Sequence, residues 1–156
     1  MLETAYVLPV MIAVVFFTVE VIGYAMNSFA VNDVLTDVHS TILSEISEVS
    51  NLEAGQTLDS SIKYASCGSN DKVELPTGVN SSINNIVKTA LALKHITFTA
   101  SDPGVTKITK SVVSGFDVYV VNFSGTANTL VLPDMFSILL PINVDTVISV
   151  KDSCES

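Results

Sequence analysis

The first thirty residues of the chain form a nearly unbroken apolar run. From Ala5 to Ala30 most side chains are aliphatic or aromatic, and Glu20 is the one charged residue in the run. At 1.5 Å per residue, a helix over this run is long enough to cross about 30 Å of membrane hydrocarbon. The pattern therefore predicts a helix over residues 1–31 that is apolar on all sides, and the simplest interpretation is a membrane anchor.

Beyond Ala30 the apolar residues fall three and four positions apart. They are Val31, Val34, Leu35, Val38, Ile42, Ile46 and Val49. This spacing is typical of an amphipathic helix that packs one face against a domain, with Asp33, Asp37, Glu45 and Glu48 on a solvated face. No Pro or Gly interrupts the pattern before Gly55. We therefore expect one helix from about residue 2 to about residue 51, about 75 Å long, with residues 32–54 as its amphipathic continuation.

Residues 55–156 predict a globular head with both helices and strands. A short helix is expected over 58–65, and a longer one from Asn80, which is a good N-cap residue. Runs rich in Val, Ile, Thr, Phe and Tyr predict strands at 95–101, 105–113, 116–123, 129–132 and 145–150. The run 135–142 fits an edge strand or a buried loop because it contains Pro141. The fold class is α+β, with the long N-terminal helix packed on a small antiparallel sheet.

The charge balance excludes one large class of partner. The chain has 7 Lys, no Arg and 16 acidic residues, for a net charge of −9. Nucleic acid binding needs a basic surface, so no nucleic acid partner is expected.

The first cation in the chain is Lys63, and eight acidic residues precede it. A membrane segment normally carries Lys or Arg on its cytoplasmic side. We therefore expect that a basic leader has been removed and that Met1 is a mature N-terminus. The alternative is that Met1 is the initiator and that the acidic flank alone sets the orientation.

The two cysteines, Cys67 and Cys154, predict a disulfide if the chain is exported behind its apolar N-terminus. Closing the loop between Cys67 and Cys154 would stabilise the fold by about 4 kcal/mol in the chain-entropy description. Two free thiols are the alternative. A redox pair is not expected because the cysteines are not in a C-x-x-C arrangement.

Enzyme chemistry is not indicated by any motif. His39 and His95 have no third ligand at metal spacing, and no serine lies in a nucleophile elbow. We expect no catalytic residues, no metal and no cofactor. Asn80 and Asn122 each begin an Asn-x-Ser pattern, which is a short and unspecific signal for N-glycosylation.

The N-terminal motif carries a family resemblance. The stretch from Glu3 to Pro9, followed by an apolar run that closes near Glu20 and Gly23, resembles TadE/TadF-like pilins of the tight-adherence pilus system. That group is a branch of the type IV pilin superfamily and typically begins Glu-Phe-Ala-Leu-Val-Leu-Pro. Thr4 stands where the family has Phe. The strands and prolines of the second half also look similar, at Val118, Val120, Phe123, Pro133, Phe136, Pro141, Val144 and Ile148.

This resemblance implies a structural role. A pilin is held in the inner membrane until a prepilin peptidase removes its leader, and the new N-terminus is methylated. Dedicated machinery then assembles it into an extracellular filament used for adhesion. Its partners are identical or related pilin subunits in a helical polymer. A chain of 156 residues is larger than the helix-only pilins. The size implies a minor pilin or a filament built from a larger one.

The resemblance also gives four residues a role in assembly and register. Glu3 is expected to pair with the N-terminal amine of Met1 in a neighbouring subunit, since a desolvated carboxylate needs a partner. Pro9 is expected to kink or loosen the first turns. Glu20 is left with three alternatives: it is protonated, it bonds Thr18 or Ser28 of a neighbour, or it faces water. The alternative function is a binding or sensor domain anchored outside the membrane by one helix.

Overall fold

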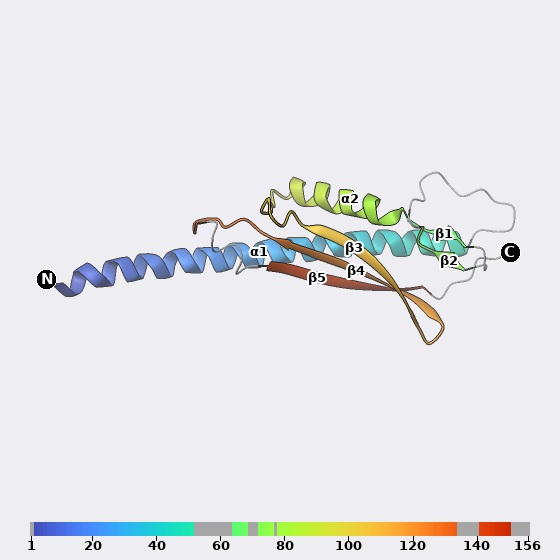
Figure 1. Cartoon of the computed structure of the whole chain (residues 1–156), viewed down its shortest axis with the longest axis horizontal. Helices are drawn as coiled ribbons and strands as arrows, with labels where there is room; N and C mark the ends of the chain where they lie inside the picture. Colours follow the sequence, from blue (N-terminus) through green and yellow to red (C-terminus); the bar gives the residue numbers. More distant parts are fainter. Residues whose placement is uncertain (1, 52–63, 69–71, 77, 134–140, 151–156) are drawn as a thin grey trace.

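One long helix runs through most of the length of the molecule (Figure 1). The computed structural model describes residues 2–51, 64–68, 72–76, 78–133 and 141–150. Its elements in chain order are α1 (Leu2–Ser50), β1 (Ser66–Cys67), β2 (Val73–Glu74), α2 (Val79–Leu93), β3 (Val105–Val113), β4 (Phe116–Thr126) and β5 (Pro141–Val150).

Helix α1 matches the predicted helix to within a residue or two at its C-terminal end. It continues without interruption through Pro9. All seven apolar residues of the predicted stripe, from Val31 to Val49, are buried. The spacing of three and four thus identified the face that packs on the head.

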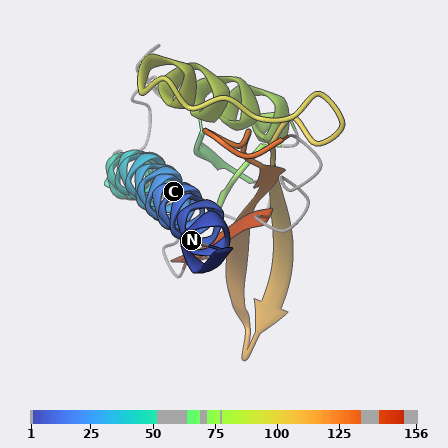
Figure 2. The same ribbon diagram turned by 90° about the vertical axis from the view of Figure 1, so that its left-hand side faces the viewer.

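The head is built on a three-stranded antiparallel sheet in the order β3-β4-β5. Tyr119, Val121 and Phe123 alternate along β4 on the buried face, and Ile142 and Ile148 on β5 join them. The second half of α1 packs against β5 and against α2, and α2 packs against β3, so the two helices lie side by side on the sheet, as the view along the helix axis shows (Figure 2). The expected α+β class, with a long helix on an antiparallel sheet, is confirmed.

The hairpin between β3 and β4 turns at Ser114 and Gly115, as the sequence predicts. Both residues have positive φ, 53° and 84°. Two-residue turns of this kind match the twist of antiparallel strands, and glycine adopts the required conformation without steric cost.

Several predicted strands differ from the observed ones. In the predicted strand 95–101, Phe98 and Thr99 form isolated bridges only. Strand β4 extends three residues past its predicted end, and β5 begins at Pro141 rather than at residue 145. A first strand position suits proline because its missing N–H is then not required by the ladder. The predicted strand 129–132 is wrong, since this segment bends instead of pairing.

The helix boundaries in the head also need correction. Helix α2 begins at Val79 with Gly78 as its N-cap, and Asn80 is not the cap. The Asn80 side chain instead accepts the Ile108 N–H of β3 at 2.7 Å, because the strand edge offers an unpaired donor. Of the predicted helix 58–65, residues 58–63 lie outside the described residues and 64–65 are not helical.

The short antiparallel pair β1–β2 was not predicted. It carries Cys67, which is disulfide-bonded. The chain has one other cysteine, Cys154, which lies outside the described residues.

The acidic residues of α1 do not all face solvent. Asp33, Asp37 and Glu48 are exposed, but Glu45 is buried and accepts the Tyr64 N–H at 2.6 Å. Burial raises the pKa of the Tyr64 phenol, and the negative charge of Glu45 adds to this increase. The prediction of a fully solvated acidic face is therefore wrong at Glu45, because the Tyr64 N–H donates a hydrogen bond to that buried carboxylate.

Candidate functional site

The N-terminal part of α1 stands clear of the head (Figure 1). Every residue from Tyr6 to Val19 is exposed, and most are large and apolar. By length and composition this helix is apolar enough to cross a membrane. The portion from Leu2 to Val19 is about 27 Å long at 1.5 Å per residue, close to the roughly 30 Å of membrane hydrocarbon. We call residues 2–19 the bare segment.

The bare segment ends at a buried carboxylate. Glu20 is 3% exposed although its neighbours Val19 and Val21 are exposed. Its two oxygens accept the Leu130 N–H at 3.0 and 3.1 Å, and one of them also accepts the N–H groups of Val131 at 3.1 Å and Leu132 at 3.3 Å. An ionised carboxylate only accepts hydrogen bonds, so three converging N–H donors suit it.

The next turn of α1 completes the contact. Gly23 lies against the side chain of Leu130, where an added Cβ atom would stand 2.2 Å from the Leu130 Cδ1 atom. Tyr24 donates its hydroxyl hydrogen to the Pro141 carbonyl at 2.9 Å. Glu20 and Gly23 thus hold the segment after β4 against the helix, and Tyr24 holds the start of β5 against the same stretch. We call this set, Glu20, Gly23 and Tyr24 with residues 130–132 and 141, the junction.

The structure separates the sequence-predicted residues. Glu20 belongs to the junction, whereas Glu3 lies 17 positions earlier, about 25 Å away along the helix. Pro9 lies within the bare segment. Met1 and the side chain of Glu3 lie outside the described part of the chain.

The partner of Glu20 is its own chain, whereas the sequence alternatives named only a residue of a neighbouring subunit or water as its partner. Leu130, Val131 and Leu132 are more than 100 positions away. Their run, followed by Pro133, has the composition of a strand. The available signal was the unpaired carboxylate in an apolar run, which needs hydrogen-bond donors from somewhere in the fold.

The histidines have structural positions. The His39 Nδ1 atom lies 2.8 Å from the Thr146 hydroxyl oxygen, so His39 joins α1 to β5. His95 follows the end of α2 with a positive φ of 59°. Neither residue lies in the junction.

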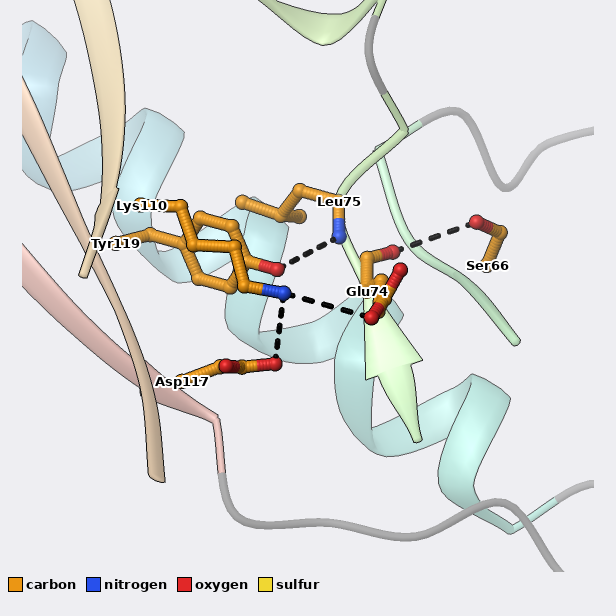
Figure 3. Close-up of polar contacts among 6 residues, drawn as sticks. All are labelled: Ser66, Glu74, Leu75, Lys110, Asp117 and Tyr119. Carbon is orange, nitrogen blue, oxygen red and sulfur yellow. Dashed lines mark hydrogen bonds and ion pairs between the residues drawn. The ribbon is translucent and has the colours of Figure 1, made fainter. Parts of the chain in front are cut away.

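A second polar cluster lies at the other end of the head, where the β1–β2 pair meets the sheet (Figure 3). The Lys110 ammonium is 2.9 Å from an Asp117 oxygen and 3.4 Å from a Glu74 oxygen, and it lies 5.7 Å from the centre of the Tyr119 ring. The Tyr119 hydroxyl accepts the Leu75 N–H at 3.4 Å. Lys110 therefore joins β2 to the sheet.

Ion pairing changes the proton affinity of the Lys110 ammonium. The hydrogen bond to Asp117 raises the pKa of the Lys110 ammonium above its usual range. A pKa raised by folding stabilises the folded state fully below the ordinary lysine pKa, and this stabilisation is lost only as the pH rises through the raised value.

We expect Lys110→Met to lower the free energy of unfolding by about 1–2 kcal/mol, because Asp117, whose side chain is 12% exposed, loses its partner. The measurement is urea unfolding of the full chain in mild detergent, followed by circular dichroism. The difference from the wild type should stay constant from about pH 6 to about pH 9, where lysine remains charged. Lys107→Met is the control, since Lys107 is exposed on the same strand and forms no ion pair within the described residues. Equal losses in both variants would contradict a role for the ion pair.

Compared with known proteins, the chain matches no family model, no curated protein and no solved structure.

Proposed function

We propose that this protein is a structural pilin subunit that polymerises through its N-terminal helix into an extracellular filament used for surface attachment. Before assembly the bare segment lies in the inner membrane, and a prepilin peptidase and the assembly machinery act on the chain there. In the filament the same segment packs against the helices of identical or related subunits.

The observation that carries this proposal is the continuous helical connection between the bare segment and the head. Helix α1 is continuous from Leu2 to Ser50, and the junction fixes the head to it just beyond Val19. A subunit whose helix packs in a filament core must hold its head at a fixed angle and height, because every copy repeats the same contacts. A tethered domain needs no such connection.

The chemistry of the bare segment suits both stages of this proposal. From Tyr6 to Val19 its exposed side chains are apolar apart from Thr18, so lipid tails or neighbouring helices cover them equally well. Glu3, at the start of the segment, would pair with the N-terminal amine of Met1 in the next subunit and so set the register between helices. Removing one partner of a buried charge pair costs roughly 3–5 kcal/mol.

A second candidate function is a binding or sensor domain held outside the membrane by one helix. The observation that favours it is an apolar cavity of ≈ 180 Å³ between α1 and α2, lined by Val34, Tyr64 and Ile86 among others. In that case the bare segment would remain in the bilayer and the cavity would hold a small apolar group.

The deciding experiment is immunogold electron microscopy of material sheared from the cell surface, with antibody to residues 95–150. Label along thin filaments is expected for a main subunit, and label at filament tips for a minor one. Label confined to membranes, without filaments, would reject the filament proposal in favour of the anchored domain.

The register role of Glu3 has its own test. We expect Glu3→Ala to reduce the number of filaments per cell several-fold while the amount of protein in the membrane is unchanged, because the charge pair is lost. Glu48→Ala is the control, since Glu48 is exposed on the same helix. Normal filament numbers with Glu3→Ala would contradict the register role without touching the subunit proposal.

A further inference from the structure

A second apolar surface lies beside the helix where the bare segment ends. Leu130 is 63% exposed and Val131 is 44% exposed. None of the residues from 127 to 133 is charged. In Figure 1 this segment leaves β4 and runs beside α1 toward the N-terminal end of the helix.

The position of this surface along the helix is fixed by the junction. The Leu130 backbone is bound by Glu20, and the Leu130 side chain lies against Gly23. The bare segment is about 3 Å shorter than a typical hydrocarbon layer. A layer that begins at Leu2 therefore reaches the turn of α1 at Glu20–Gly23, against which Leu130 lies, and the exposed side chains of Leu130 and Val131 lie next to the apolar surface of the bare segment.

The backbone N–H groups of the segment are already hydrogen-bonded within the chain, as an apolar environment requires. Unpaired N–H groups are costly in a bilayer, so irregular backbone enters it only where these groups are satisfied. The N–H groups of Leu130, Val131 and Leu132 all donate to Glu20, and Pro133 has none. Four consecutive residues thus present no free N–H to their surroundings.

We propose that residues 129–133 form a membrane foot, in which Leu130 and Val131 insert into the boundary between head groups and acyl chains of the bilayer that α1 crosses. The foot fixes how deeply the subunit sits, and Glu20 supplies the hydrogen-bond acceptors that water would otherwise provide. This inference rests on the membrane-embedded stage of the proposed function, and it adds a second contact with lipid outside the helix.

The test uses the absence of tryptophan from the natural chain. Val131→Trp places a single indole on the foot of the full-length protein, reconstituted in phosphatidylcholine vesicles with and without bromine on the acyl chains. We expect a blue-shifted emission in plain vesicles and a loss of intensity in the brominated ones. If circular dichroism shows that Val131→Trp is misfolded, Leu130→Trp carries the same test.

Two further single-tryptophan variants make the result decisive. Val14→Trp lies on the bare segment and should be quenched, whereas Val112→Trp lies exposed on the β3–β4 hairpin and should emit as in water. A foot variant that behaves like Val112→Trp, while Val14→Trp is quenched, overturns the foot and leaves the anchor standing. If Val14→Trp is also unquenched, the membrane stage of the proposed function fails as well. A blue shift that bromine does not quench, and that grows with the protein-to-lipid ratio, would overturn the lipid contact in favour of a second copy of the chain.

Discussion

Glu20→Ala should release the segment after β4 from the helix and speed the hydrogen exchange of the amides of Leu130, Val131 and Leu132 by about a hundredfold. Three N–H donors lose a charged acceptor, and a hydrogen bond to a charged group contributes about 1.5–3 kcal/mol. The desolvation of the carboxylate offsets part of this, since the variant no longer buries it. A net local loss of about 3 kcal/mol corresponds to the expected factor.

The measurement is amide exchange followed by nuclear magnetic resonance on the full chain in detergent micelles. Glu20→Gln should fall between the wild type and the alanine variant, because its amide retains one acceptor oxygen but turns donor hydrogens toward donors. Glu48→Ala removes an exposed carboxylate from the same helix and should leave these three amides protected. Unchanged exchange in Glu20→Ala would mean that the carboxylate does not hold the segment.

The long helix could be predicted because its signal is local and repeated. The buried stripe from Val31 to Val49 occurs at the helical period over several turns, and each position supports the same interpretation. The hairpin at Ser114 and Gly115 is similar, since turn residues and alternating strands stand side by side in the sequence. Few contacts with distant parts of the chain override a local pattern of this length.

The junction could not be predicted because its two sides are far apart in the sequence. Residues 129–132 have strand composition, but hydrogen bonds to Glu20 hold them in a bend. Asn80 has the composition of a cap, but an edge donor on β3 takes its side chain. In both cases a distant backbone N–H found a side-chain oxygen, and local propensity gave way to that contact.

The burial of Glu45 also could not be predicted from local sequence. Spacing placed Glu45 on the polar face of the helix, yet it is buried because the Tyr64 N–H comes to meet it. Periodicity indicates which face is polar on average. It does not indicate which polar residue on that face is given a buried partner by a later part of the chain.

Ile42→Asp should separate the head from α1 and lower the free energy of unfolding by more than about 4 kcal/mol. Ile42 is fully buried at the middle of the stripe and belongs to the hydrophobic core that the helices share with the sheet. The change deletes a large apolar side chain from the core and leaves an unpaired charge there, and each effect alone is strongly destabilising. A loss of this size is a large part of the 5–15 kcal/mol by which domains are stable.

Leu43→Asp is the matched control, because Leu43 is the next residue and is 42% exposed. It should change the stability by less than about 1 kcal/mol, as surface substitutions usually do. The measurement is the urea midpoint of the full chain in mild detergent, followed by circular dichroism. Equal midpoints for the two variants would contradict the orientation of α1 against the head. A large difference would show that the stripe holds the head on the same helix whose other half is bare, so that one continuous element joins two different environments.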